Sequence, residues 1–222
     1  MNPIKDYPPP KILYEDNHLI AVHKPAGMPS QGDNSGDESV FDWVKEFIRV
    51  KYKKPGNVYI GLLHRLDRPV AGIMLLAKTS KAATRMSEMF RKRKVLKIYQ
   101  AMVLAPPKQT SGQLSHFVGK VPGQVNIMRA FPKDGEGRKS AVLDYCIAGE
   151  RKGHCLLEIR PQTGRKHQIR VQLAAIGCPI VGDMKYSKTA PLPDRSIGLL
   201  AQTLIFQHPV KKEEEIRIET KW

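Results

Sequence analysis

The sequence predicts an α+β fold on a mixed, mostly antiparallel sheet. Segments with strand patterning dominate the 222 residues, and only three segments have the apolar spacing of amphipathic helices. Strands and helices do not alternate regularly along the chain, which argues against the βαβ units of a parallel sheet. The hydrophobic content of 41% suffices for a substantial core. The length fits one domain or two closely packed lobes.

The N-terminal part combines a lead-in, two strands and a helix. The segment MNPIKDYPPP (1–10) is proline-rich and lacks an apolar period, so we predict a flexible lead-in followed by one domain over 11–222. Residues 11–27 predict two short strands around the turn EDNH and then a Pro/Gly loop. Residues 38–54 predict a helix ended by Pro55-Gly56, with one apolar face formed by Val40, Phe41, Val44, Phe47 and Ile48.

Two buried strands are predicted at 57–63 and 72–78, joined by HRLDRPVA (64–71). Pro69 disfavours helical angles at Arg68. Asp67 is therefore expected on a short, stiff loop between two core strands, a common position for a functional residue. A second helix is predicted at 79–95, with Thr79 or Ser80 as N-cap and Met86, Met89 and Phe90 facing the core. Its terminal cations, Arg91–Lys94, suit a helix C-terminus or contact with phosphate.

The second half of the chain is richer in strands. One strand is predicted at 97–104, and residues 105–139 predict a long excursion with short strands at 117–121 and 125–130. Residues 140–148 and 154–161 predict a hairpin around GERKG (149–153). A third helix is predicted at 166–177, closed by Gly177. The tail from 179 to 222 is expected to add two or three strands.

The charge balance indicates a polyanionic partner. The chain has 37 lysines and arginines and 21 acidic residues, which gives a net charge of +16. Nucleic acid is the commonest partner of a protein with such an excess of positive charge. A membrane is disfavoured because the longest apolar runs, of about six residues, fall far short of the roughly 20 that a bilayer requires. We find no lipidation signal, basic amphipathic anchor or signal peptide.

The three cysteines and the absence of known cofactor and nucleophile motifs limit the kinds of site that the chain could carry. Cys146, Cys155 and Cys178 are odd in number and lack C-x-x-C spacing, which disfavours disulfides and zinc and indicates core cysteines in a reducing cytoplasm. Phosphate-cradling, dinucleotide-binding, H-E-x-x-H and G-x-S-x-G motifs are absent, and the seven histidines lack ligand spacing. An enzyme of this sequence is expected to use no metal or nucleotide cofactor.

The segment HRLDR places Asp67 between Arg65 and Arg68, either as a surface salt bridge in a turn or as a functional carboxylate. HRLDRPVAGIMLLAK resembles the H-R-L-D-R-x-T-S-G-L-L-L-L-A-K block of RluA-type RNA pseudouridine synthases. ILYEDNHLIAVHKPAG, KIYQAMV and RPQTGRKHQIRVQLAAIGCPIVGDMKY are similar to further blocks of that family, in the same order, and the likeness runs from about residue 11 to 218.

The resemblance implies a pseudouridine synthase catalytic fold and an isomerase that needs no cofactor. Such enzymes cut the N1–C1′ bond of a uridine in RNA, turn the base and rejoin it through C5. The resemblance implies catalytic roles for Asp67 as the essential aspartate, Tyr99 against the target base and Arg170 as the aspartate's basic partner. It further implies substrate-binding roles for Arg65, which fills the gap left by the flipped nucleotide, and for Arg68, Arg165 and His167. Neighbouring cations can lower a carboxylate's pKa by roughly 1–3 units, which suits a nucleophile or an electrostatic stabiliser.

The sequence departs from the family pattern in places. Val70-Ala71 replaces Thr-Ser after the aspartate, and Leu200-Ala201 lacks the His of the family's L-H-A. No N-terminal S4-type RNA-binding domain is expected. Two functions remain open: a monomeric synthase acting on rRNA or tRNA, and an inactive RNA-binding protein of the same fold. A ribosomal structural protein is disfavoured because the chain has no long basic extension.

Overall fold

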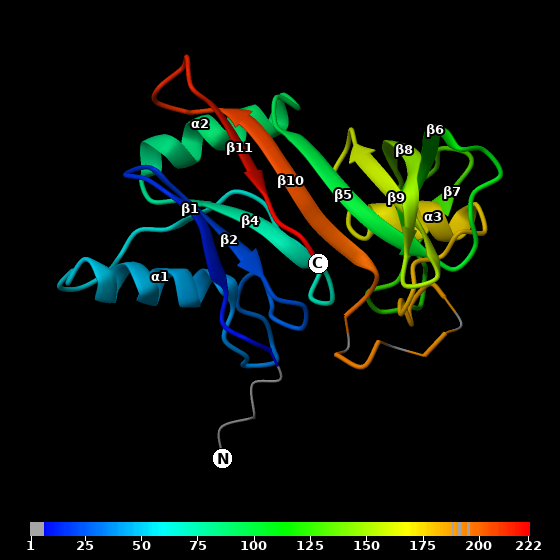
Figure 1. Cartoon of the computed structure of the whole chain (residues 1–222), viewed down its shortest axis with the longest axis horizontal. Helices are drawn as coiled ribbons and strands as arrows, with labels where there is room; N and C mark the ends of the chain where they lie inside the picture. The colour runs from blue at the N-terminus through cyan, green and yellow to red at the C-terminus, as the bar shows by residue number, and fades with distance from the viewer. Residues whose placement is uncertain (1–6, 188, 191, 195) are drawn as a thin grey trace. The chain divides into compact units, whose positions relative to one another are not determined.

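The computed structural model describes residues 7–187, 189–190, 192–194 and 196–222, and the chain forms two compact units. Unit 1 comprises the residues up to Leu96 together with Ala201–Trp222, and unit 2 comprises Lys97–Leu200. Strands β5 (Leu96–Val103) and β10 (Leu199–Gln207) each cross a boundary between the units. Figure 1 labels the helices and strands of both units apart from β3.

Unit 1 is built on a sheet with the strand order β1-β2-β4-β10, with β3 paired to β4 and β11 to β10. Its other strands are β1 (Lys11–Glu15), β2 (Leu19–Lys24), β3 (Gly61–Leu62), β4 (Ala71–Ala77) and β11 (Glu215–Glu219). The pairings β1–β2, β2–β4, β3–β4 and β10–β11 are antiparallel. The strand predicted at 57–63 is reduced to two residues. Val58 and Ile60 are nevertheless buried, because they pack into the core beneath a helix.

Helices α1 (Val40–Lys51) and α2 (Ser80–Arg91) cover opposite faces of this sheet (Figure 1). Successive strand side chains point to opposite faces, so the strands alternate between two cores. One core joins the α2 side, including Leu19, Ala21, Ala82 and Met86. The other joins the α1 side, including Ile20, Val22, Val40 and Val44. Burial on both faces accounts for the uninterrupted apolar runs of β2 and β4.

Helix α2 begins as predicted, helix α1 begins two residues later than predicted, and both end earlier. The Ser39 hydroxyl accepts from the Asp42 backbone N–H, and the Thr79 hydroxyl accepts from that of Ala82. The α2 helix ends at Arg91 rather than at 95, since Arg93 adopts a left-handed φ of 57°. Three of the four terminal cations therefore lie beyond the helix, and Lys92 pairs with Glu88 at 2.7 Å.

Unit 2 contains an antiparallel sheet in the order β5-β9-β8-β6-β7. Its further strands are β6 (Ser111–Lys120), β7 (Met128–Phe131), β8 (Lys139–Arg151) and β9 (His154–Pro161). The predicted β8–β9 hairpin is confirmed, with a tighter turn. Lys152 and Gly153 have φ values of 50° and 75°, as a two-residue hairpin turn requires. The β6 strand is longer than predicted because it pairs with β8 from Ser111 to Val118.

Helix α3 (Gln168–Ala175) packs against β6 and β7 of unit 2. Val171 joins Val118 and Ala141 in a small core. The buried Gln172 amide donates to backbone carbonyls of β6 and β8 at 3.1 and 3.0 Å. The helix starts two residues later than predicted because His167 takes a left-handed φ of 55°. Gly177 follows the helix with a φ of 80°, as expected of a helix-ending glycine.

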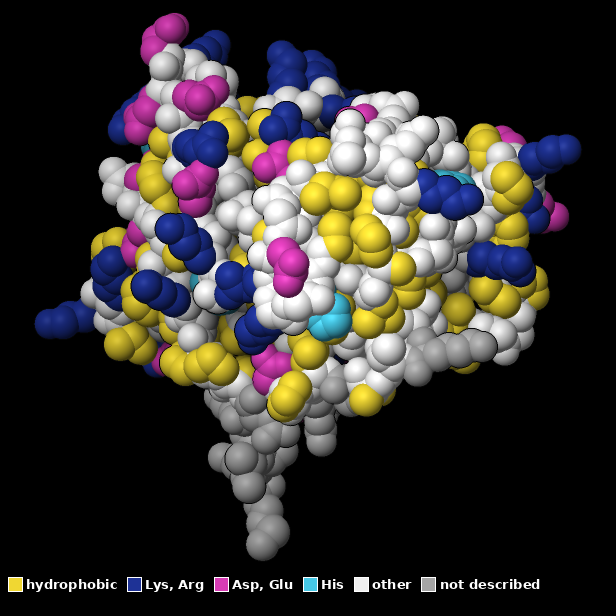
Figure 2. Space-filling view, turned by 45° about the vertical axis from the view of Figure 1, so that its right-hand side comes forward, with side chains coloured by type: hydrophobic (Ala, Val, Ile, Leu, Met, Phe, Trp, Pro, Cys, Tyr) yellow, Lys and Arg dark blue, Asp and Glu magenta, His cyan; other side chains and the backbone are white. Residues whose placement is uncertain are grey.

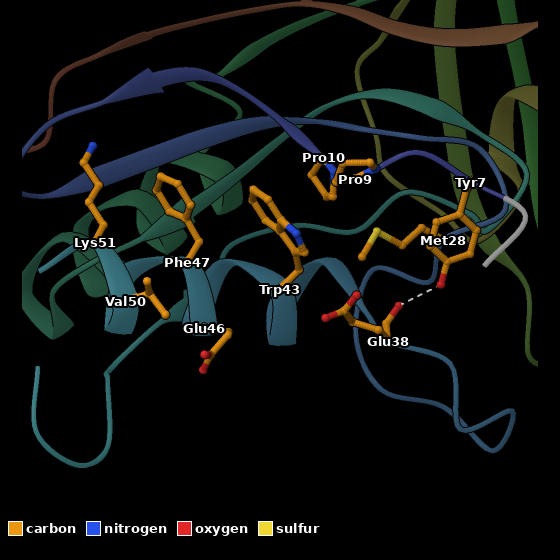
Figure 3. Close-up of a pocket in the computed structure, with 10 residues that line it drawn as sticks. All are labelled: Tyr7, Pro9, Pro10, Met28, Glu38, Trp43, Glu46, Phe47, Val50 and Lys51. Carbon is orange, nitrogen blue, oxygen red and sulfur yellow. Dashed lines mark hydrogen bonds between the residues drawn. The ribbon is translucent and has the colours of Figure 1, made fainter. Parts of the chain in front are cut away.

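The described part of the lead-in packs on α1. Residues 1–6 of the predicted flexible segment lie outside the described residues, whereas the Tyr7 hydroxyl donates to the Glu38 carbonyl at 3.1 Å. Pro9 and Pro10 line a cavity of about 540 Å³ with the stacked rings of Trp43 and Phe47 (Figure 3). Two of its charged lining residues form ion pairs: Glu46 with Arg49, and Lys51 with Glu15. None of the predicted site residues lines this cavity.

The described chain offers neither a membrane span nor a metal cluster. None of its helices is long and apolar enough to cross a bilayer. Nor do the described residues include a group of three or more His, Cys, Asp or Glu side chains that could hold a metal ion. All three cysteines are free; Cys178 is buried, whereas Cys146 and Cys155 are half-buried rather than full members of the core.

Candidate active site

Asp67 lies in unit 1 on the loop between β3 and β4, as the sequence predicts. Its carbonyl accepts from the Val70 N–H at 3.0 Å, which closes a turn that contains Pro69. The neighbouring Leu66 and Val70 side chains are 7% and 3% exposed, so they anchor the turn in the core. The Asp67 side chain is half-buried and Arg65 is exposed. The carboxylate is thus carried by a short loop with fixed ends.

The loop after β2 holds the residues on both sides of Asp67. The Ser30 hydroxyl accepts from the Leu66 N–H at 3.0 Å and donates to the Leu66 carbonyl at 2.7 Å. The Gly27 N–H donates to the Arg68 carbonyl at 2.9 Å, and the Arg68 Nε–H donates to the Gly27 carbonyl at 2.7 Å. Because both neighbours are fixed through their backbones, the path of the chain at Asp67 is fixed as well.

Lys24 is a fully buried cation beside this turn. Its ammonium donates to the carbonyls of Pro25, Met28 and Arg68 at 2.9, 2.8 and 3.0 Å, one acceptor for each of its three N–H bonds. Burial lowers the pKa of Lys24 to about 7; the negative charge of Asp67 acts in the opposite direction, and the charge of Arg68 adds to the lowering. Sequence reasoning missed this residue. Its signal is a lone lysine that ends an apolar strand directly before Pro25.

The Arg68 guanidinium has two acidic neighbours that the sequence did not suggest. It pairs with Asp37 and lies 3.9 Å from Asp33, both in the loop that precedes α1. Its side chain is 43% exposed, so this is a surface ion pair of small energetic value. The charge of Arg68 is therefore partly balanced by these two acids, and the expectation that both flanking arginines serve Asp67 stays a prediction.

The buried lysine makes stability depend on pH in a defined direction. The pKa of Lys24 is about 7 in the folded chain and about 10.5 in the unfolded chain. Between these values the unfolded chain binds the extra proton, so the free energy of unfolding rises by about 1.4 kcal/mol per pH unit. Below pH 7 the contribution is constant. Relative to Lys24→Met, the wild type should gain about 2 to 3 kcal/mol from pH 7.5 to 9.5 in urea unfolding.

Lys81→Met is the matched control for this measurement, because Lys81 is exposed on α2. Its difference from the wild type should not change over the same pH interval. A Lys24→Met difference that is equally flat would contradict the assignment of a depressed pKa to the buried ammonium.

Arg170 lies in unit 2 on α3 and is 3% exposed; it is not the surface helix residue that its position alone would suggest. Its Nε and Nη2 groups donate to the two carboxylate oxygens of Asp183, each at 2.7 Å, and Asp183 is 1% exposed. The guanidinium carbon lies 5.0 Å from the centre of the Tyr186 ring. This buried, two-pronged ion pair was not predicted from the sequence.

The other predicted residues of unit 2 surround the start of α3 or lie on β5. His167 is 8% exposed, and its Nδ1 lies 2.6 Å from the Tyr186 hydroxyl, so Tyr186 links it to Arg170. Arg165 is half-buried, and its Nε–H donates to the Ser140 carbonyl at 2.9 Å. Tyr99 is half-buried on β5, opposite Ile159 of β9.

The predicted residues thus fall into two sets. Unit 1 carries Asp67 with Arg65 and Arg68, and unit 2 carries Tyr99, Arg165, His167 and Arg170. The first set offers a carboxylate on a rigid turn, which can act as a nucleophile or stabilise a developing positive charge. The second offers a buried guanidinium whose orientation is set by an aspartate.

Comparison with known proteins matches the chain to one family. The family model "RNA pseudouridylate synthase" matches residues 18–175. The chain is 29% identical over 211 residues to "Ribosomal large subunit pseudouridine synthase C" of Rickettsia typhi, covering 95% of this chain and 67% of that protein. It is 32% identical over 222 residues to "Ribosomal large subunit pseudouridine synthase D" of Vibrio cholerae, covering 93% of this chain and 65% of that protein.

A solved structure agrees with the sequence matches. The structure titled "Human RNA Pseudouridylate Synthase Domain Containing 4" superposes with a TM-score of 0.78 at 26% identity, covering 95% of this chain and 88% of that one. The matched family segment contains Asp67, Tyr99 and Arg170. The chain therefore belongs to the RNA pseudouridylate synthase family, whose members are isomerases.

Proposed function

We propose that the protein isomerises uridine to pseudouridine in ribosomal RNA. Family membership and the names of two relatives, ribosomal large subunit pseudouridine synthases C and D, support this proposal. The observation that carries it is Asp67 in the HRLDR segment, on a turn whose two flanking backbones are hydrogen-bonded in place. The net charge of +16 suits a polyanionic substrate.

The proposed reaction moves one bond from nitrogen to carbon. The N1–C1′ bond of the uridine breaks, the base turns within the site, a C5–C1′ bond forms, and the proton leaves C5 while N1 gains one. Asp67 is proposed to attack the sugar or to stabilise its cationic form, Tyr99 to pack against the base, and Arg170 to balance the aspartate's charge. We propose that residues 11–222 act as one catalytic domain.

The target uridine has to leave its stack before the sugar can be reached, at a cost of a few kcal/mol. We propose that Arg65 fills the gap and that Arg68 and Arg165 contact phosphates. The buried His167 ring faces Tyr186, which favours support of Arg170 over a direct contact with RNA. Figure 2 shows lysine and arginine side chains spread over the face in view, among apolar and acidic ones. Phosphate contacts over a broad surface would offset the cost of flipping.

The test maps pseudouridines in rRNA and tRNA from a strain that lacks the gene. At least one rRNA position should be unmodified in that strain, and the purified protein should restore it in RNA from the strain without added metal or nucleotide. We further propose that it acts as a monomer in the cytoplasm, where its three free cysteines would stay reduced. If the deletion strain keeps every pseudouridine of the wild type, the proposed function is wrong. If it loses a pseudouridine only from tRNA, the substrate is tRNA rather than rRNA.

The replacement of Thr-Ser by Val70-Ala71 beside the aspartate motivates one competing function, an RNA-binding protein without activity. RNA containing 5-fluorouridine separates the two. Fluorine at C5 blocks the last proton loss, so an active enzyme should leave an altered or trapped product at the target position. A protein that only binds RNA leaves the fluorinated base unchanged.

A further inference from the structure

We infer that Asp183 and Tyr186 are positioning residues for Arg170, which they hold in one orientation before RNA arrives. The inference rests on the proposed function, because that function gives Arg170 its role in the reaction. Asp183 and Tyr186 lie in the segment after α3, outside the HQIR motif. All the contacts that support the inference lie within unit 2.

The ion pair fixes the plane of the guanidinium. Arg170 uses Nε and one Nη2 hydrogen on the two oxygens of Asp183, each at 2.7 Å. A guanidinium is planar and carries five N–H bonds in a fixed fork. Once one edge is held by two bonds, the directions of the three N–H bonds that Asp183 does not use are fixed as well. Asp183 therefore determines which way Arg170 can donate.

Because both partners are buried, the Arg170–Asp183 ion pair is expected to persist with and without RNA. Arg170 and Asp183 are 3% and 1% exposed, and a buried charge without a partner is strongly destabilising. Arg170 therefore needs a counter-ion whether or not RNA is bound. A group that is charged and oriented before the substrate arrives requires little reorganisation during the reaction.

Asp183 is itself held by the turn that it begins. Its carbonyl accepts from the backbone N–H groups of Tyr186 and Ser187 at 3.0 and 2.7 Å, and its own N–H donates to the Ile180 carbonyl at 3.2 Å. Gly182 precedes it with a φ of 75°. The same short turn thus presents both the carboxylate and the Tyr186 ring to Arg170.

Tyr186 connects this turn to the start of α3. Its ring lies beside the guanidinium, with 5.0 Å between the guanidinium carbon and the ring centre, within the range of a cation–π contact. Its hydroxyl lies 2.6 Å from His167 Nδ1 and accepts from the Met128 N–H at 3.0 Å. His167 is the residue directly before α3, so Tyr186 contacts both the start of the helix and Arg170 within it. Tyr186 therefore joins the turn, the helix and strand β7 around the arginine.

The test measures kcat and KM for pseudouridine formation in Asp183→Asn, Arg170→Met and the double variant. Asparagine keeps the shape but turns an N–H donor towards the guanidinium, so Asp183→Asn should lower kcat about 100-fold, the effect of a misplaced catalytic group, with KM within a few-fold of wild type. In the Arg170→Met background the same change should cause no further loss, because Asp183 acts through Arg170. A purely structural role would not produce this cancellation.

Glu158→Gln is the matched control, since it breaks a carboxylate–arginine pair between the half-buried Glu158 and the exposed Arg160 in the same unit and should leave kcat unchanged. If Asp183→Asn does not fold, Tyr186→Leu carries the test by itself: it keeps the ion pair and should lower kcat about tenfold, with KM within a few-fold of wild type. Equal losses in both backgrounds, or full activity of whichever variant folds, would overturn the inference. Wild-type protein that modifies no uridine would instead overturn the proposed function.

Discussion

Asp67→Asn is expected to reduce pseudouridine formation at least about 10⁴-fold, as removal of a nucleophile does in other enzymes. The amide has nearly the same shape as the carboxylate but carries no negative charge, so it can neither attack the sugar nor stabilise a cation there. The fold should tolerate the change. The turn is held through the backbones of Leu66 and Arg68 and through the buried Leu66 and Val70 side chains, none of which involves the carboxylate.

The measurement is a single-turnover assay on the rRNA from the deletion strain, with RNA affinity and thermal unfolding determined in parallel. Asp134→Asn serves as control, because Asp134 is an exposed acid of unit 2 and its loss should leave the rate unchanged. Affinity and unfolding midpoint of Asp67→Asn should stay close to wild type. A rate within tenfold of wild type would exclude the proposed role of this carboxylate.

The fold could be predicted wherever local pattern and burial agree. The apolar runs at β2 and β4 and the helical period at α1 translate directly into elements, because each is set by burial on a regular surface. Residues 57–63 are apolar for another reason: Val58 and Ile60 pack under α1, and only Gly61 and Leu62 pair with β4. Hydrophobicity reports burial, not hydrogen bonding, so this segment was predicted as a longer strand than it is.

The loop that carries Asp67 could be predicted from the sequence, whereas the ion-pair partners of Arg68 and Arg170 could not. Apolar flanks and Pro69 indicate a stiff turn at Asp67 from neighbouring residues alone. The partners of Arg68 are Asp33 and Asp37, more than 30 residues earlier in the chain, and no spacing rule connects them. The same holds for Arg170 and Asp183, whose pairing depends on how the chain folds back after α3. Charge partners distant in sequence require the tertiary structure.

Gly72→Ala is expected to lower the free energy of unfolding by about 4 kcal/mol, the sum of backbone strain and steric overlap. Gly72 has a φ of 123°, a region that side chains rarely adopt. A Cβ there would lie 2.3 Å from the carbonyl oxygen and 2.6 Å from the nitrogen of Ala201. These are backbone atoms of β10, which neighbours β4 in the sheet, so they cannot rotate away. The thermal midpoint should fall by about 10 °C.

Gly32→Ala is the matched control, because a Cβ at Gly32 meets nothing within 4 Å and the residue lies in the loop that holds the Asp67 turn. It should leave the unfolding midpoint nearly unchanged. Equal midpoints for the two variants would show that β4 and β10 can separate at Gly72 without cost. A selective loss at Gly72 would instead show that close packing of the two strands is a condition of the fold. Since Gly72 pairs with Lys24 and lies five residues after Asp67, that packing would then also fix the strand from which the Asp67 turn projects.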